Sequence, residues 1–202
     1  MNFKLYLETA WKLTIKYIAP LILMTLVMGV ASVITLGFLA PVMMAGYMQA
    51  VLLMIRNGRE PVIQDVFSQM KLFFPLLGFG IAVFILIMMG LMMFILPGIL
   101  ISLAISFICL YMLPLMTDKQ KGIIEALKES FAITTDKEKF SDHLIVAILI
   151  TGIYMVGGYT YIGWIFTLPF STVFLMLIYE EQVNRMPMQP MYQAEPPEQN
   201  NA

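Results

Sequence analysis

The longest charge-free run of the chain, from Leu72 to Thr117, constrains the fold more than any other feature. It holds 46 residues without one Lys, Arg, Asp, Glu or His. A single helix of that length would reach roughly 70 Å, over twice the ~30 Å hydrocarbon core of a bilayer. Pro97, which breaks helices, and Gly98, which tolerates turn dihedrals, lie near its middle. The run therefore predicts a membrane hairpin that turns at Pro97-Gly98.

Two further charge-free runs have the same form. Residues 17–55 and 144–179 contain 39 and 36 residues, and each has turn-forming residues near its centre. Each run suits two crossings of about 18–23 residues. The chain is therefore expected to be an all-α integral membrane protein with six spans in three hairpins. The residues expected to shape the turns are Pro41, Pro97, Gly98 and Pro169.

The predicted spans together form one membrane domain, residues 1–182. The remaining residues, 183–202, contain four prolines and many Gln and Asn, which predicts a disordered cytoplasmic tail. The expected bounds of the spans are about 18–36, 38–55, 73–95, 97–116, 143–160 and 162–180.

The composition agrees with a membrane protein. The chain is 60% hydrophobic and 12% charged, whereas a soluble domain is about 25% charged. Its net charge of −1 gives no field that would attract nucleic acid, so no nucleic-acid partner is expected. Lysines precede the first apolar segment, as in a signal peptide. That segment is too long for a signal peptide and belongs to the repeated pattern, so an uncleaved first span is expected.

Each charge-free run follows a mixed stretch with helical periodicity. These stretches predict amphipathic helices along the bilayer surface; solvated loop helices are the alternative. Surface helix, outward span and inward span would then repeat three times, and Lys16–Leu21 aligns with Lys71–Leu76. The expected apolar faces are Phe3, Leu7, Ala10, Trp11, Thr14 and Ile18; Val62, Ile63, Val66, Phe67 and Met70; and Ile123, Leu127, Phe131 and Thr134.

The distribution of charge predicts the topology. All 12 Lys and Arg and all 13 Asp and Glu lie in the N-terminus, in 56–71, in 118–143 or from Glu180 onward, and the predicted hairpin tips carry none. The positive-inside rule then places both termini and both long connections in the cytoplasm. The expected location is the cell membrane, with the bilayer as the principal partner.

No catalytic or cofactor-binding pattern is evident in the sequence. His143 beside Asp142 is conceivable as a general base, but a boundary residue facing lipid headgroups is the favoured interpretation. One His and one Cys exclude the usual zinc sites within the chain, and the frequent Met residues are interpreted as packing rather than copper ligands. Lysines are interspersed among the acidic residues that a hard cation would need, which are Asp118, Glu125, Glu129, Asp136, Glu138 and Asp142.

Four polar residues are the candidates for function. Gln49 is the only side-chain amide in the predicted spans, and it is expected to contact a neighbouring helix or, alternatively, to line a polar pathway. No ionisable residue is expected at mid-depth, which disfavours an ion-coupled transporter. The candidates for the cytoplasmic interface are Arg56, Arg59 and Lys71.

Short motifs carry a family resemblance. They are Gly46-Tyr47, Arg56-Asn57-Gly58-Arg59-Glu60-Pro61 with Asp65, Pro97-Gly98, and Asp118, Gly122, Glu125-Ala126-Leu127 and Ser130. With these the chain resembles a group of six-helix prokaryotic membrane proteins that includes the YciC-like proteins and the membrane domain of some glycerophosphodiester phosphodiesterases. The resemblance implies a six-helix membrane domain of unsettled function. The phosphodiesterase activity is not implied, because that chemistry belongs to a separate soluble domain.

The expected function is that of a non-enzymatic multi-pass membrane protein acting on lipid or on partner membrane proteins, with self-association as a further possibility. The alternative is a small-molecule or lipid transporter in which Gln49 and the Gly and Pro breaks shape a pathway. A membrane enzyme working at the cytoplasmic interface through Arg56 and Arg59 is a third, less favoured hypothesis.

Overall fold

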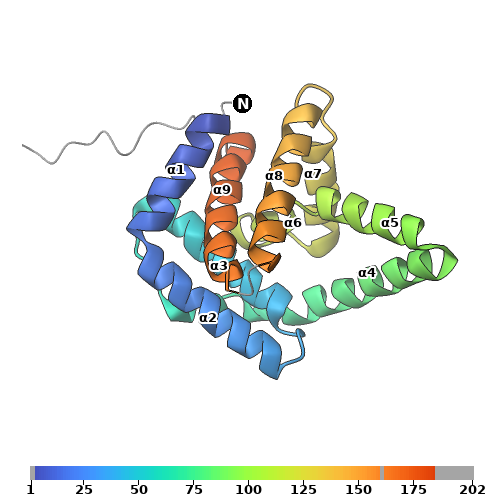
Figure 1. Cartoon of the computed structure of the whole chain (residues 1–202), viewed down its shortest axis with the longest axis horizontal. Helices are drawn as coiled ribbons and strands as arrows, with labels where there is room; N and C mark the ends of the chain where they lie inside the picture. The colour runs from blue at the N-terminus through green and yellow to red at the C-terminus, as the bar shows by residue number, and fades with distance from the viewer. Residues whose placement is uncertain (1–2, 160–161, 185–202) are drawn as a thin grey trace, which may run out of the picture.

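The computed structural model describes residues 3–159 and 162–184, and within these ranges the regular structure is entirely helical. The apolar segments are rich in Leu, Ile, Met and Ala, which favour helices, and a helix satisfies its own backbone in an apolar environment. Figure 1 shows the arrangement. In chain order the elements are α1 (Phe3–Lys16), α2 (Ile18–Ile34), α3 (Ala40–Asn57), the 3₁₀ segments η1 (Ile63–Phe67) and η2 (Met70–Leu72), α4 (Phe73–Met93), α5 (Ile95–Ile108), α6 (Met112–Asp118), α7 (Ile123–Thr134), α8 (Phe140–Tyr159) and α9 (Trp164–Asn184).

The helices indicate a membrane-embedded protein. Four helical stretches among the described residues are long and apolar enough to cross a bilayer. A fifth is obtained if α1 and α2, which meet at an angle of 84°, form one broken span. The helix α2 alone has only 17 residues, and α3 carries Gln49, Arg56 and Asn57 among its 18. The four stretches are Ile63–Met92, Ile95–Asp118, Phe140–Tyr159 and Trp164–Val183.

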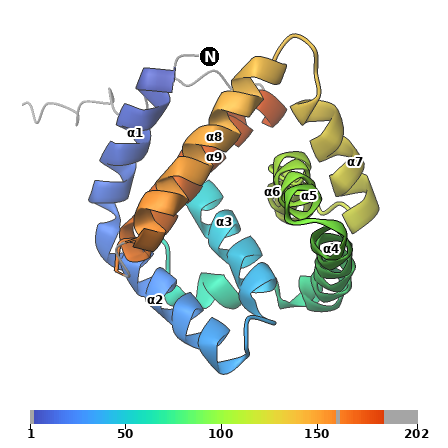
Figure 2. The ribbon, with the colours of Figure 1, turned by 45° about the vertical axis from the view of Figure 1, so that its right-hand side comes forward.

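The core of the molecule lies around α3 and α9. Every residue from Ser171 to Glu180 is buried, as are eleven residues of α3. Figures 1 and 2 show why: α1, α2 and α8 lie beside these two helices. A helix that is covered on all sides has no polar stripe, so α3 and α9 are apolar around most of their circumference. The largest side chains that are fully buried include Tyr47, Tyr111, Phe174 and Tyr179.

The helices α4 and α5 form a hairpin that we call the arm, residues Phe73–Ile108. In Figure 1 the arm projects to the right, away from α1, α8 and α9, and Figure 2 shows it nearly end-on. Its two helices approach closely through glycine, because a Cβ on Gly90 would lie 3.0 Å from the Gly98 Cα atom. Most of its other apolar side chains are exposed.

The turn of the arm differs from the predicted turn at Pro97-Gly98. The chain reverses at Phe94, whose backbone is extended, and both Pro97 and Gly98 lie in the first turn of α5. Proline is tolerated there because the first N–H groups of a helix have no helical partner. Gly98 serves the packing of the two helices rather than the reversal of the chain.

Pro41 and Pro169, the other two prolines expected to shape turns, also lie in helices. Pro41 occupies the first turn of α3, and the preceding turn is made by Leu36 and Gly37, both with positive φ angles. Pro169 lies inside α9. One turn further on, the Thr172 hydroxyl donates a hydrogen bond to the Leu168 carbonyl at 2.8 Å.

The stretches expected to be surface helices differ among themselves. Residues 63–72 form 3₁₀ segments and not an α-helix, because the Val66 and Asp65 carbonyls pack directly on α3 at Gly46, where a Cβ would lie 2.4 Å from the Val66 oxygen. The helix α1 lies alongside α9 in Figures 1 and 2 and buries Tyr6, Ala10 and Thr14.

The helices α1 and α7 each carry exposed apolar side chains as well as buried ones. Trp11, expected on the apolar face of α1, is 59% exposed, and its ring meets Phe170 edge-on at 6.0 Å. The helix α7 buries Ala126, Ser130 and Thr134, and it leaves Phe131 half-exposed. Apart from Tyr6, the buried residues of both helices are small, which allows close packing. The predicted tail, 183–202, lies outside the described residues beyond Asn184.

Candidate functional site

The ends of α3, α6 and α9 meet at four polar residues that we call the charged hub: Arg56, Asp118, Tyr179 and Glu180. The Arg56 guanidinium donates from Nη1 and Nη2 to the two oxygens of Asp118, at 2.5 and 3.0 Å. Its Nε donates to Glu180. The Tyr179 hydroxyl donates to Asp118 Oδ2 at 2.9 Å. One guanidinium therefore holds two carboxylates from two different helices.

The spacing of the hub residues along the chain is regular. Asp118 follows Arg56 by 62 residues, and Glu180 follows Arg56 by 124, so the two intervals are equal. Arg56 lies in the last turn of α3, and Asp118 is the last residue of α6. Glu180 lies in the last part of α9. Each of the three predicted hairpins thus contributes one charged residue from the end of its second helix.

Burial makes the partners in the hub depend on one another. The side chain of Arg56 is 27% exposed, and those of Asp118 and Glu180 are 9% exposed. The hydrogen bond to Asp118 raises the pKa of the Arg56 guanidinium above its ordinary value, so Arg56 stays charged. A buried carboxylate that loses its cation costs several kcal/mol, on the order of 3–5. The loss of Arg56 would therefore leave two buried carboxylates without their cation.

The three predicted interface residues do not come together. Arg56 is in the hub, whereas Arg59 pairs with Asp65, whose carboxylate also accepts the Val62 N–H at 3.0 Å. Lys71 hydrogen-bonds the side chain of Gln120. Arg59 thus fixes the start of η1, and Lys71 ties η2, at the base of the arm, to the segment that follows α6.

The turn after α3 explains Gly58 of the Arg56–Pro61 motif. Gly58 ends α3 in the left-handed conformation, with φ 63°, and its N–H donates to the Met54 carbonyl at 3.0 Å. Glycine is favoured at this position because it adopts a positive φ without strain. The Gly58 carbonyl accepts a hydrogen bond from the Tyr17 hydroxyl at 3.2 Å. The motif therefore ties α3 to the junction of α1 and α2.

Gln49 makes no hydrogen bond to a neighbouring helix through its carbonyl oxygen. Its Oε1 atom is buried and has no hydrogen-bond partner among the described residues. The side chain as a whole is only half-buried on α3. A buried amide oxygen without a donor costs free energy, on the order of 1–3 kcal/mol. The Gln49 Oε1 atom is thus a buried acceptor without a hydrogen-bond donor among the described residues.

His143 lies inside the protein rather than at its boundary. Its side chain is 1% exposed, and Nδ1 is 3.0 Å from the Tyr111 hydroxyl. The Tyr111 ring stands edge-on to the imidazole and lies 6.4 Å from the Tyr179 ring. The prediction that His143 faces lipid headgroups is therefore wrong, because Tyr111 provides its partner within the bundle.

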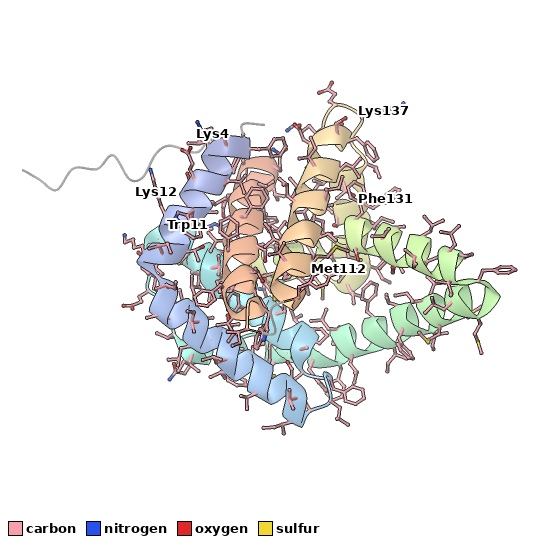
Figure 3. The ribbon with its side chains drawn as sticks, in the orientation of Figure 1. Lys4, Trp11, Lys12, Met112, Phe131 and Lys137 are labelled. Atoms are coloured by element: carbon pink, nitrogen blue, oxygen red, sulfur yellow. The ribbon has the colours of Figure 1, made fainter. Side chains whose placement is uncertain are left out.

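The hub has limited capacity for chemistry. Both of its carboxylates accept hydrogen bonds from Arg56, so neither is placed as a free general base. Within the described residues, no group of three or more His, Cys, Asp or Glu side chains is arranged to hold a metal ion. Two shallow hollows, of about 330 and 250 Å³, lie on the outer surface and are lined by other residues. The first is formed by α1, from which Lys4 and Lys12 point outward in Figure 3.

The hub was not evident from the sequence. Asp118 is one of several carboxylates in 118–142, and Tyr179 and Glu180 sit at the end of a long apolar segment. One signal was present in the sequence. A charged residue directly follows each of the three charge-free runs, and these three residues are equally spaced. Which charges pair is a tertiary property that no local pattern contains.

Comparisons of the chain with protein-family models, with curated proteins and with solved structures found no match.

Proposed function

We propose that the chain is a non-enzymatic multi-pass protein of the cytoplasmic membrane, with six spans in three hairpins and both termini in the cytoplasm. In this proposal it acts on lipid or on partner membrane proteins, in the manner of a six-helix membrane domain. The observation that carries the proposal is the combination of the hub with the arm. The hub ties the hairpins together at their charged ends, and the arm extends away with apolar sides exposed.

The position of the hub supports the topology. Arg56, Asp118 and Glu180 lie at helix ends that face the charged connections, whereas the hairpin tips carry no charged residue. A buried Arg–carboxylate group is costly at the bilayer centre and is better tolerated near the boundary. The location of all Lys and Arg on one side of the predicted spans supports a cytoplasmic position for that side.

The arm supports an action on lipid or on membrane proteins. Monomeric soluble proteins rarely expose apolar patches larger than a few hundred Å². On the arm, exposed apolar side chains follow both helices and the tip, which suits lipid chains or the spans of another membrane protein. Those exposed residues include Phe74, Ile81, Phe84, Met89, Met92, Phe94, Ile95 and Leu100.

Two outer helix faces support contact with the bilayer surface. On α7, the exposed Ile124 and Phe131 lie on the same side of the helix as Lys128. On α1, the exposed Trp11 and Ile15 accompany Lys12. Apolar side chains beside lysines are typical of helices at the lipid–water interface, where the lysine stems snorkel toward the headgroups.

Cysteine accessibility tests the proposed topology. Single cysteines would replace the exposed tip residues Leu36, Leu96 and Ile162, and Lys121 in a connection, in a Cys109→Ala parent. In intact cells a membrane-impermeant reagent is expected to label the three tips and to leave position 121 unlabelled until the membrane is opened. A tip cysteine that, like position 121, is labelled only after the membrane is opened would contradict the three-hairpin topology.

A transporter is the second candidate, and Gln49 is the observation that favours it. Its buried, unpartnered Oε1 atom is suited to bind a polar solute or headgroup. In sealed vesicles, wild type and Gln49→Leu would be compared for movement of fluorescent phospholipid and of small polar solutes. Movement that Gln49→Leu abolishes would replace the leading proposal with transport. No movement above protein-free vesicles is the result that the leading proposal predicts.

A further inference from the structure

The predicted span 97–116 is interrupted in the structure. The helix α5 ends at Ile108 and α6 begins at Met112, so Cys109–Tyr111 form a break. At the break the backbone hydrogen bonds join residues three positions apart instead of four. Leu110 N–H donates to the Phe107 carbonyl at 3.3 Å, and Met112 N–H donates to the Cys109 carbonyl at 3.1 Å. The i→i+4 ladder of a continuous helix is therefore lost at this point.

A side chain from another helix occupies the break. Ser130 of α7 accepts the Tyr111 N–H at 3.1 Å and donates its own hydroxyl to the Ile108 carbonyl at 2.5 Å. In a continuous α-helix, the Tyr111 N–H would bond the Phe107 carbonyl and the Ile108 carbonyl would accept from Met112. Ser130, which is fully buried, thus takes the place of the missing helical partners. A side chain inserted into the hydrogen-bond ladder is a recognised cause of helix kinks.

The two sides of the break differ in how firmly they are held. On the core side, Tyr111, Met112 and Leu115 are buried, and Asp118 is bound in the hub. On the other side, α5 packs chiefly on α4 and is otherwise largely exposed.

At its other base, the arm begins at a 3₁₀ segment. There α4 follows the three-residue 3₁₀ segment η2. The arm is therefore joined to the rest of the protein through two short segments that are not α-helical, η2 and Cys109–Tyr111.

We propose that the arm is a hinged unit that moves relative to the core about the Cys109–Tyr111 break, and that Ser130 sets its angle. When Ser130 holds the break, the arm has the direction seen in Figure 1. When Ser130 withdraws, Ile108 and Tyr111 regain helical partners, and the angle between α5 and α6 changes. Because Ser130 belongs to α7, a displacement of α7 is transmitted to the arm. The proposal goes beyond the function proposed above and does not depend on the number of spans.

Distances between spin labels test the hinge. Labels at Met92 on the arm and Tyr159 on α8, which are 89% and 87% exposed, report the arm angle. A second pair, at Val33 on α2 and Tyr159, reports the core. Both pairs would be measured in lipid nanodiscs on full-length Cys109→Ala protein, with and without Ser130→Ala. The matched control is Ser102→Ala, which removes a serine whose hydroxyl, among the described residues, bonds the Ile99 carbonyl of its own helix.

The expected result is a change confined to the arm. With a lever of about 21 Å for α5, each 10° of rotation moves the tip by about 4 Å. Ser130→Ala is expected to shift or broaden the 92–159 distribution by at least that amount and to leave the 33–159 distribution unchanged, and Ser102→Ala to alter neither. Superimposable 92–159 distributions in all three proteins would overturn the proposal.

If Ser130→Ala does not fold, the hinge can still be tested in the protein that keeps Ser130. In the Cys109→Ala protein alone, the 92–159 distribution is expected to be broader than the 33–159 distribution. Equal, narrow widths for the two pairs would overturn the proposal without any change at Ser130.

Discussion

Arg56 and Asp118, 62 residues apart in the chain, form a bidentate ion pair in which Nη1 donates to Oδ1 and Nη2 donates to Oδ2. The same guanidinium holds Glu180 through Nε. Such paired hydrogen bonds fix geometry as well as charge, and a lysine cannot reproduce them. The three helix ends in the hub are thereby held in one arrangement, and the arm projects away from α1, α8 and α9 (Figure 1).

Removing the Tyr179 hydroxyl should weaken the hub without removing a charge. Tyr179→Phe deletes the hydrogen bond to Asp118 and leaves the packing of the ring intact. A hydrogen bond to a charged group contributes about 1.5–3 kcal/mol, so a loss of this size in the free energy of unfolding in mixed micelles is expected. The control is Tyr154→Phe, at an exposed tyrosine of α8. Equal stability of the two variants would show that the Tyr179 hydroxyl does not support Asp118.

Two glycine substitutions should act in opposite directions. In Gly46→Ala the new Cβ would lie 2.4 and 2.6 Å from the carbonyl oxygens of Val66 and Asp65. These are backbone atoms, so η1 must shift, and a loss of about 1–3 kcal/mol is expected. In Gly152→Ala the Cβ enters open space, and a gain of roughly 0.5–1 kcal/mol is expected from helix propensity. Thermal unfolding in detergent measures both; a Gly46→Ala protein as stable as wild type would contradict the packing of η1 on α3.

The buried pair of His143 and Tyr111 should show non-additive behaviour. His143→Leu leaves the Tyr111 hydroxyl without its partner, which costs about 1–3 kcal/mol. Adding Tyr111→Phe removes the orphaned hydroxyl as well, so the double variant is expected to be no less stable than His143→Leu alone. Mixed-micelle unfolding of the two single variants and the double variant measures this coupling. If His143 faces solvent or headgroups instead, the two effects will simply add.

The positions of the helices were predictable from the charge-free runs, because a long apolar segment in a membrane protein has few alternatives to helix. The turn of the arm was displaced to Phe94 because Pro97 is compatible with the first turn of a helix. The second surface stretch became 3₁₀ because Gly46 lets its backbone pack against α3. In both cases a local pattern allowed two outcomes, and packing between helices selected one.

The candidate site was predictable only in part. Arg56 was expected at the cytoplasmic interface, but its partners Asp118 and Glu180 lie 62 and 124 residues away. Arg59 and Lys71 were grouped with it because they share one connection, whereas the structure gives each a separate partner. His143 was misplaced because burial beside Tyr111 depends on the packing of α8 against the α5–α6 break.

A double-mutant cycle at Arg56 and Asp118 tests the central role of the hub most directly. Arg56→Met should cost on the order of 3–5 kcal/mol, because it leaves two buried carboxylates without their cation. Asp118→Leu in the same protein removes one of those carboxylates. The double variant should therefore have a free energy of unfolding in mixed micelles at least about 1 kcal/mol higher than that of Arg56→Met alone. That recovery corresponds to a coupling energy larger than that of an exposed ion pair. If the two substitutions instead destabilise the protein additively, Arg56 and Asp118 are not energetically coupled, and the hub does not hold the three hairpins together.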